Sequence, residues 1–300
     1  MILLWSLSFI VVDISVEFIT PLSIALYRFI IASGGFIIIR LIRRFFTKDS
    51  NSESSLKNDA PFSKKSWIFL FFASITGVSF FFYTQYNAIE LIGPSLPALF
   101  VCLLSPVLIS LLAIIVFKEN LTPLKIVGFL IATIGGFLLV TGGNIKILMP
   151  DSPNFLGYLF ALLTPIFWSI YSTITKKISQ NNSNIKMLEY IGYLGTIELL
   201  ILVLISNEFE IFLQNIFNPV ILLGGLYLGI GCYVIGYYIW QYSQKNLMSS
   251  KVASFLYIEP FITLIISSLL QREETIVFWN IVGGLIVLMA VLLINYEKRR

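Results

Sequence analysis

Long apolar runs follow one another along almost the whole chain, and this feature limits its fold more than any other. Each run has about the 20 apolar residues that a helix needs to cross a bilayer. Proline, glycine, asparagine and aspartate separate the runs, as at Gly93-Pro94 and Asn218-Pro219, which is typical of turns. We place the spans at about 2–18, 21–41, 66–89, 94–117, 122–141, 154–175, 187–206, 218–241, 248–270 and 276–296.

Composition supports this interpretation. Apolar residues make up 57% of the chain and charged residues 12%, and the mean hydropathy is +0.90. A soluble domain has roughly a quarter charged residues. The sequence therefore predicts an all-α integral membrane protein with ten transmembrane helices. The one long polar stretch, 43–65, is predicted to be a flexible cytoplasmic loop.

Basic residues predict the orientation, because they concentrate in cytoplasmic loops. With ten spans, only Lys146 and Arg272 fall on one side, and Arg28 lies inside a span. Both termini are thus predicted to be cytoplasmic, in a multi-pass protein of the cell membrane. The basic residues on the other side are Arg40, Arg43, Arg44, Lys48, Lys57, Lys64, Lys65, Lys118, Lys125, Lys176, Lys177, Lys186, Lys245, Lys251, Lys298, Arg299 and Arg300.

Several short patterns occur twice, in the same order, in the two halves of the chain. Glu119 precedes Gly128 as Glu274 precedes Gly283, and the proline of the preceding span also recurs. Five spans per unit is an odd number, so the second unit must enter the membrane inverted, as in many secondary transporters. We predict a first repeat at 1–141, an external linker at 142–153, a second repeat at 154–296 and a basic tail at 297–300. The remaining pairs are Pro106 with Pro260, Gln85-Tyr86 with Gln241-Tyr242, and Trp5-Ser6 with Trp168-Ser169.

The residues give no support for an enzyme. The chain has no histidine, and its two cysteines, Cys102 and Cys232, lie in apolar runs where they are predicted to pack between helices. We find no glycine-rich phosphate loop, metal-binding cluster or nucleophile with a base. No catalysis, cofactor or metal is expected. Nucleic-acid binding is not expected either, because the net charge of +4 arises from loops beside apolar spans.

Ionisable residues inside a span are costly and suggest function. Glu259 is the strongest candidate, since it lies near the middle of its span beside Pro260, where the proline exposes polar backbone. It could bind a cation or a proton. Arg28 and Asp13 lie at similar depths in neighbouring spans. They could form a structural ion pair, or a pair that substrate or a proton opens. Glu17 and Glu198 are weaker candidates.

Aromatic and amide side chains in the same spans could orient a substrate against an apolar wall. Some of them could instead belong to the aromatic belts at the membrane surfaces. The candidates are Tyr83, Tyr86, Asn87, Trp168, Tyr171, Tyr238 and Gln241, with Gln85 and Tyr237 beside them.

These motifs resemble the drug/metabolite transporter superfamily, in its ten-helix EamA-type branch. The resemblance rests on 4–9, 21–32, Ser105-Pro106 with 119–122, and Glu259-Pro260 with 273–275. It implies a central cavity bounded mainly by spans 1, 3, 4, 6, 8 and 9, and the export or exchange of small metabolites. Many relatives carry a lysine in span one where this chain has Asp13, so a carrier of anions held by that lysine is not implied.

A secondary active transporter explains the repeat and the buried acid better than the alternatives, which are a passive channel, an intramembrane enzyme and a membrane scaffold or sensor. A closed-ended cavity near the midplane would favour the carrier, and a continuous pore would favour the channel. The expected substrates are small molecules such as amino acids or related compounds, with protons as a candidate coupling ion.

Overall fold

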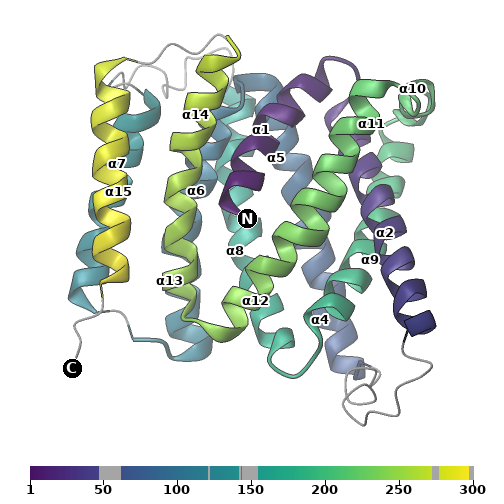
Figure 1. The fold of residues 1–300 in the computed structure, drawn as a ribbon, viewed down its shortest axis with the longest axis horizontal. Coiled ribbons are helices and arrows are strands. Elements are labelled where there is room, and N and C mark those ends of the chain that lie inside the picture. The colour runs from purple at the N-terminus through teal and green to yellow at the C-terminus, as the bar shows by residue number, and fades with distance from the viewer. Residues whose placement is uncertain (47–61, 121, 142, 144–154, 272–276, 297–300) are drawn as a thin grey trace.

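The protein is described by a computed structural model covering residues 1–46, 62–120, 122–141, 143, 155–271 and 277–296. All regular secondary structure in these ranges is helical. The helices stand side by side in a bundle, with their axes roughly parallel (Figure 1).

Seven helical segments in the described residues are long and apolar enough to cross a membrane. Three of them contain a change of helix type. The seven are α2 (Pro21–Phe46); α4 (Lys64–Ser74) with η2 (Ile75–Ser79) and α5 (Phe80–Ile92); α6 (Ser95–Phe117); α8 (Phe155–Ser179); α9 (Asn184–Ile205); α11 (Pro219–Leu226) with η4 (Tyr227–Tyr237) and α12 (Tyr238–Asn246); and α13 (Ser249–Ser254) with η5 (Phe255–Ile258) and α14 (Glu259–Leu269).

Three further apolar helices are shorter: α1 (Ile2–Val16), α7 (Pro123–Thr141) and α15 (Phe278–Asn295). Every one of these segments overlaps a run predicted from the sequence. The chain is therefore an all-helical integral membrane protein.

The predicted turn residues end and begin these helices for identifiable reasons. Gly93 takes a φ of 75° between α5 and α6, a left-handed conformation that suits glycine. Asn218 caps α11, since its side chain accepts a hydrogen bond from Val220 N at 2.9 Å, and Pro219 fits the first helical position.

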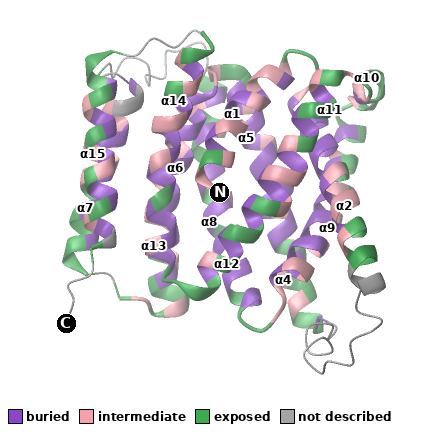
Figure 2. Ribbon diagram, viewed as in Figure 1, coloured by how far each residue is buried: buried purple, intermediate pink, exposed green. Residues whose placement is uncertain are grey.

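Large apolar side chains cover the outside of the bundle, while its interior holds the polar groups. Ile115, Leu223, Leu269 and Leu292 are among those exposed by two thirds or more of their surface. Figure 2 shows exposed residues along the outer helix faces and buried residues along the inner ones. This distribution is the one expected where lipid surrounds the protein.

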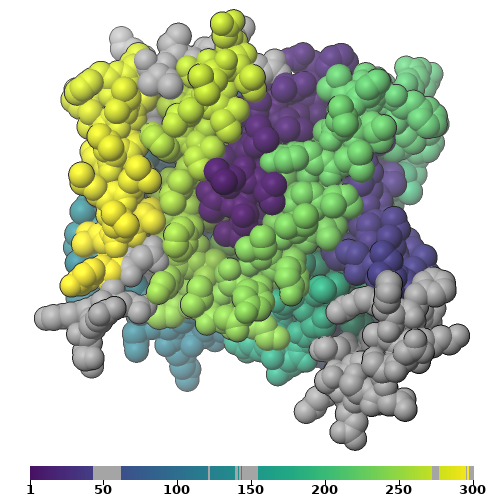
Figure 3. All heavy atoms as spheres, viewed as in Figure 1, coloured from purple at the N-terminus to yellow at the C-terminus, as the bar shows by residue number. Residues whose placement is uncertain are grey.

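The helices α7 and α15 form one edge of the bundle, and α2 and α9 form the opposite edge (Figure 1). Glycines permit close packing in α7: a methyl group on Gly128 would lie 2.5 Å from Ile294, and one on Gly135 would lie 2.6 Å from Ile286. Between the two edges lie α1, α5, α6, α8, η4 and α14. The start of α1 reaches the middle of the bundle, between α14 and the η4–α12 helix (Figure 3).

The structure differs from the predicted boundaries in three places. The helix α2 continues to Phe46 and α4 begins at Lys64, so the described ends of the predicted 43–65 loop are helical. A short helix, α10 (Phe209–Asn215), precedes α11; its seven residues are too few for a periodicity argument. The π-helical segments η2 and η4 were not predicted either. The linker at 142–153 (Gly143 apart), the tail at 297–300 and Glu274 lie outside the described residues.

Candidate functional site

A cavity in the middle of the bundle is lined by residues from both halves of the chain. Its volume is about 40 Å³, which is room for a few water molecules. It receives side chains from α1, α2, α5, α6, α8, η4, η5 and α14. The lining residues are Trp5, Ser8, Phe9, Arg28, Phe81, Phe82, Gln85, Val101, Trp168, Cys232, Tyr237, Leu256 and Glu259.

Arg28 brings a buried positive charge to this cavity. Only 2% of the residue is exposed. Its guanidinium donates to the Tyr86 hydroxyl and, at 2.8 Å, to the Leu228 carbonyl, and it lies 4.3 Å from the centre of the Phe82 ring. The Nε atom has no hydrogen-bond partner in the described part of the chain. These partners are neutral, so the charge is held in place but not neutralised.

Glu259 brings an acid from the other half of the chain. It begins α14, directly after the 3₁₀ turn η5 and before Pro260, and it is 2% exposed. Its Oε2 accepts a hydrogen bond from the Cys102 thiol at 3.3 Å, and its Oε1 has no partner among the residues that the structure describes. A thiol is a weak donor. This acid is therefore poorly satisfied by the protein alone.

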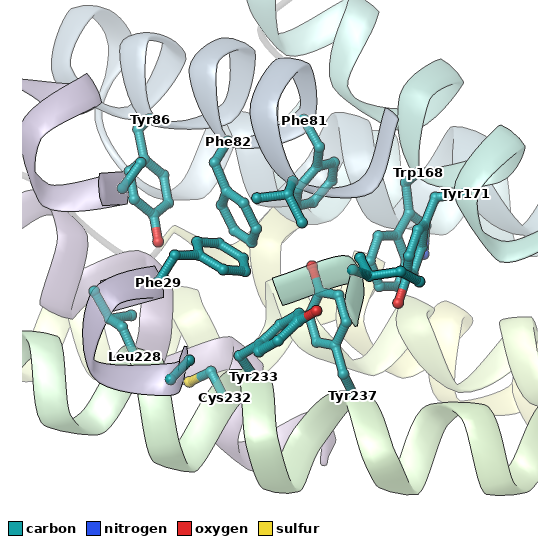
Figure 4. Close-up of a cluster of buried hydrophobic side chains, with 14 of the residues drawn as sticks. Phe29, Phe81, Phe82, Tyr86, Trp168, Tyr171, Leu228, Cys232, Tyr233 and Tyr237 are labelled. Atoms are coloured by element: carbon teal, nitrogen blue, oxygen red, sulfur yellow. The ribbon is translucent and has the colours of Figure 1, made fainter. Parts of the chain in front are cut away.

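Aromatic rings from α1, α8 and η4 form an aromatic wall of the same cavity. Trp5 and Trp168 meet edge to face with their centres 5.4 Å apart, and Tyr237 lies 5.7 Å from Trp5 and 5.3 Å from Trp168. Figure 4 shows Trp168 beside Tyr171 and Tyr237, and the rings of Phe81 and Phe82 next to each other. The indole nitrogen of Trp5 donates to the Cys232 carbonyl at 3.2 Å, whereas that of Trp168 has no described partner.

Two polar layers lie beyond the aromatic wall, toward the end of the bundle where α8 and α12 terminate. In the first layer, Gln241 donates to the Tyr171 hydroxyl at 3.1 Å and to Thr175 at 2.9 Å. In the second, Lys176 donates to Glu119 at 2.6 Å and to Ser249 at 2.8 Å. The first layer joins α8 to α12. The second layer joins α8 to the α6–α7 connection and to the start of α13.

We call the second layer the Glu119–Lys176 network; its members are Glu119, Lys176, Leu247 and Ser249. The Ser249 backbone amide also donates to both Glu119 oxygens, at 3.1 and 3.0 Å. Burial alone would raise the pKa of the Glu119 carboxyl group, but the hydrogen bonds from Lys176 and Ser249 outweigh it and hold the pKa below its ordinary value. Glu119 is therefore ionised at neutral pH.

Comparison with known proteins now identifies the family. The EamA-like transporter family matches two segments, residues 1–141 and 155–296. The chain belongs to this family. It is thus a transporter of the drug/metabolite transporter superfamily, as the sequence motifs predicted.

Individual relatives agree with this family. The transporter is 26% identical over 299 residues to an uncharacterized transporter of Archaeoglobus fulgidus, covering 99% of this chain and 96% of the relative. It is 25% identical over 279 residues to the uncharacterized transporter YyaM of Bacillus subtilis, covering 93% and 85%. Its fold resembles a solved crystal structure with a TM-score of 0.68 at 19% identity, over 98% of this chain and 94% of that one.

The structure of this EamA-like transporter places six of the ten predicted site residues in or beside the cavity. Arg28, Glu259 and Trp168 line it. Tyr86 accepts a hydrogen bond from Arg28, and Tyr171 and Gln241 form the first polar layer.

The other four predicted residues do not reach the cavity. Tyr83 packs its ring against Phe160 at 5.5 Å, and Asn87 donates to the Tyr83 carbonyl. Tyr238 is 38% exposed on the outer surface. Asp13 lies on α1 beyond the lining residues of that helix.

The structure gives Arg28 partners other than Asp13, and the pairing of Arg28 with Asp13 stays a prediction. Arg28 takes Tyr86 and Leu228 as its described partners, and no described ion pair joins it to Asp13. The two residues lie on neighbouring helices, but the guanidinium is directed toward α5 and η4.

Sequence reasoning missed most of the apolar lining. Trp5, Ser8 and Phe9 have the i, i+3, i+4 spacing of one helix face, which could have assigned them together. Cys102 was predicted only as a packing residue, yet it is the hydrogen-bond donor to Glu259.

Proposed function

We propose that this protein is a secondary active transporter, an exporter or exchanger, of small metabolites such as amino acids or related compounds. It works by alternating access around the cavity, which lies near the membrane midplane. Its ten transmembrane helices form two inverted five-helix repeats.

The observation that carries this proposal is the pair of ionisable groups at one cavity. Arg28 from the first half and Glu259 from the second both line it, and the described partners of both are neutral. Buried charges are costly unless they are paired. A zwitterion would offer a carboxylate to Arg28 and an ammonium group to Glu259, while its apolar part would contact the aromatic rings. A proton could replace the ammonium group on Glu259 when the substrate leaves.

The pattern of helix packing supports the inverted repeat. The counterpart of each helix is the one five spans later, so α1 corresponds to α8, α2 to α9, η2 to η4 and α6 to α14. When every helix is replaced by its counterpart, pairs of helices in contact correspond to other pairs in contact. The contact of α1 with α14 becomes that of α8 with α6, and the contact of α2 with η4 becomes that of α9 with η2. The pairs α7–α15 and α2–α9 are exchanged with themselves.

Two further features support the same relation. The π segments η2 and η4 each precede, in equivalent helices, the predicted equivalents Gln85 and Gln241. Trp5 and Trp168, also predicted equivalents, touch each other at the cavity. The family matches the two halves separately. Repeats of this kind permit two related conformations that open to opposite sides.

The orientation follows from the basic residues. The described basic residues at loop positions lie at the end of the bundle that holds the Glu119–Lys176 network. At this end Lys125 contacts Ser250 and Lys245 contacts the Asn182 carbonyl. We assign this end to the cytoplasm and the protein to the cell membrane. The Glu119–Lys176 network then closes the cavity toward the cytoplasm and must open in the inward-facing state.

Transport by purified protein in proteoliposomes tests this proposal. Labelled metabolites are screened, amino acids first, and hits are tested for saturation and for counterflow, in which unlabelled substrate inside the vesicle drives uptake of labelled substrate. Arg28→Gln and Glu259→Gln should reduce substrate affinity at least tenfold, and Tyr238→Phe, outside the cavity, should not. Flux that neither saturates nor shows counterflow would indicate a channel.

A further inference from the structure

Glu198 is a membrane-embedded acid that the cavity does not use. It lies on α9 and contacts two serines of the third span: Ser74 Oγ is 2.6 Å from its Oε1, and Ser79 Oγ contacts its Oε2. None of the three residues lines the cavity. They form a separate group, which we call the Glu198 site.

The π segment η2 creates this site. Ser74 and Ser79 are five residues apart and flank η2 (Ile75–Ser79). In an α-helix, with 3.6 residues per turn, they would point about 140° apart. The wider π turn, with its i to i+5 hydrogen bonds, brings them to the same face. One carboxyl group can therefore reach both hydroxyl groups only while the π segment persists.

The number of hydrogen atoms available indicates the protonation state. Ser74 Oγ is also 2.8 Å from the Phe71 carbonyl, so the site makes three oxygen–oxygen contacts. Each serine supplies one hydrogen, and an ionised carboxylate supplies none. The ionised form would therefore leave one contact without a hydrogen. In the neutral form Glu198 donates to Ser74, Ser74 donates to Phe71, and Ser79 donates to Glu198, so all three contacts are hydrogen bonds.

The described residues around Glu198 offer no counter-charge. The neighbours Ile197 and Ile201 are half exposed on the outer face of α9, so the acid lies close to lipid. The elements packed on α9 are α2, α4, η2, α8 and α12. No described titratable group on them or on α9 contacts Glu198; these groups are Tyr27, Arg28, Arg40, Lys64, Lys65, Tyr158, Tyr171, Lys176, Lys177, Lys186, Glu189, Tyr190, Tyr193, Tyr238, Tyr242 and Lys245.

We propose that Glu198 is a proton-binding site outside the substrate cavity, and that its proton holds α9 against the π segment of the third span. When the Glu198 O–H bond breaks and water takes the proton, Ser74 can no longer bind both Phe71 and the carboxylate. One hydrogen bond of the site is then lost, and the π segment is released. Because α4, η2 and α5 carry Phe81, Phe82 and Gln85 of the cavity wall, this site makes the cavity sensitive to pH.

Labelling of the full chain in lipid nanodiscs with dicyclohexylcarbodiimide tests the proposal without any substrate. This lipid-soluble reagent adds to protonated carboxyl groups, and the product is located by mass spectrometry of peptides. Glu198 should be labelled, and labelling should fall as the pH is raised. Glu189 is the matched control on the same helix: it is paired with Arg40 at 2.7 Å and should stay unlabelled.

A second measurement covers the case in which the reagent cannot reach the site. The infrared difference spectrum between low and high pH should lose a protonated-carboxyl C=O band in Glu198→Gln. Hydrogen exchange of the amides in η2, corrected for intrinsic exchange, should rise with pH in the native chain but not in this variant. An unlabelled Glu198, together with identical infrared spectra of the native chain and Glu198→Gln, would overturn the proposal. A failure of the proposed transport function would leave all these results unchanged.

Discussion

Arg28 and Glu259 share a cavity although one lies near the start of the chain and the other near its end. Each is held by neutral groups: Arg28 by Tyr86 and the Leu228 carbonyl, Glu259 by Cys102. The protein thus fixes both side chains while leaving their charges available to a ligand. Glu259 Oε1 and Trp168 Nε1, which have no hydrogen-bond partner among the described residues, are an acceptor and a donor that the proposed substrate would meet.

Replacement of Glu259 tests its part in coupling. Glu259→Gln keeps the shape but fixes the neutral state, so accumulation driven by a pH gradient should be lost, while exchange should continue at substrate concentrations high enough to offset the lower affinity. Asp13→Asn is the comparison and should have the smaller effect, because Asp13 lies outside the cavity. Uptake is measured in proteoliposomes with an imposed pH gradient. Undiminished gradient-driven uptake by Glu259→Gln would remove this residue from the coupling step.

At the scale of the element, backbone approach between α2 and η4 positions Arg28. A methyl group on Gly229 would lie 2.5 Å from the Arg28 carbonyl oxygen, which is backbone and cannot move aside. Gly229→Ala should therefore lower stability by about 1–3 kcal/mol. Gly34 on α2 has no atom within 4 Å of such a methyl group, so Gly34→Ala should be neutral or stabilising by up to ~1 kcal/mol. Thermal unfolding in detergent compares the two, and equal melting temperatures would contradict the packing argument.

The Glu119–Lys176 network gives a prediction about pH. Breaking a buried ion pair costs about 3 kcal/mol, so Glu119→Gln should lower the melting temperature. Because the pKa of Glu119 is lowered on folding, its contribution is complete above the ordinary glutamate pKa of roughly 4.3 and is lost as pH falls through the lower, folded value. The difference from the native chain should hold from pH 8 to 5 and shrink in stronger acid. Glu210→Gln, at an exposed position, is the control. A difference that instead grows in acid would contradict the assigned network.

At the scale of the whole molecule, the sequence predicted the spans well because apolar length and turn residues determine them locally. It also identified Arg28, Glu259 and Trp168, since ionisable and polar-tipped residues are conspicuous inside apolar runs. The sequence did not predict which side chains of a helix face the cavity, because this depends on the rotation of the helix about its axis. Tyr83 and Tyr238 were chosen beside Gln85 and Tyr237, which line the cavity. The π segments η2 and η4 change the faces that follow them, and periodicity cannot reveal this.

The orientation can be tested without a substrate. Single cysteines at Ser52 and Arg300 should react with a membrane-impermeant reagent only after the cells are opened, because seventeen basic residues lie on that side against two on the other. The buried native Cys102 and Cys232 should react slowly. Labelling of either introduced cysteine in intact cells would reverse the assigned orientation.

The central claim is alternating access, and distances across the two ends of the bundle test it most directly. Spin labels at Asn120 and Asn246 report on the end with the Glu119–Lys176 network, and labels at Glu90 and Leu270 report on the opposite end; all four positions are exposed. Lys176→Met removes the network's cation and should favour opening at its end. The account predicts that the 120–246 distance increases in this variant while the 90–270 distance decreases. Distances that increase together, or an unchanged 90–270 distance when the 120–246 distance increases, would contradict it.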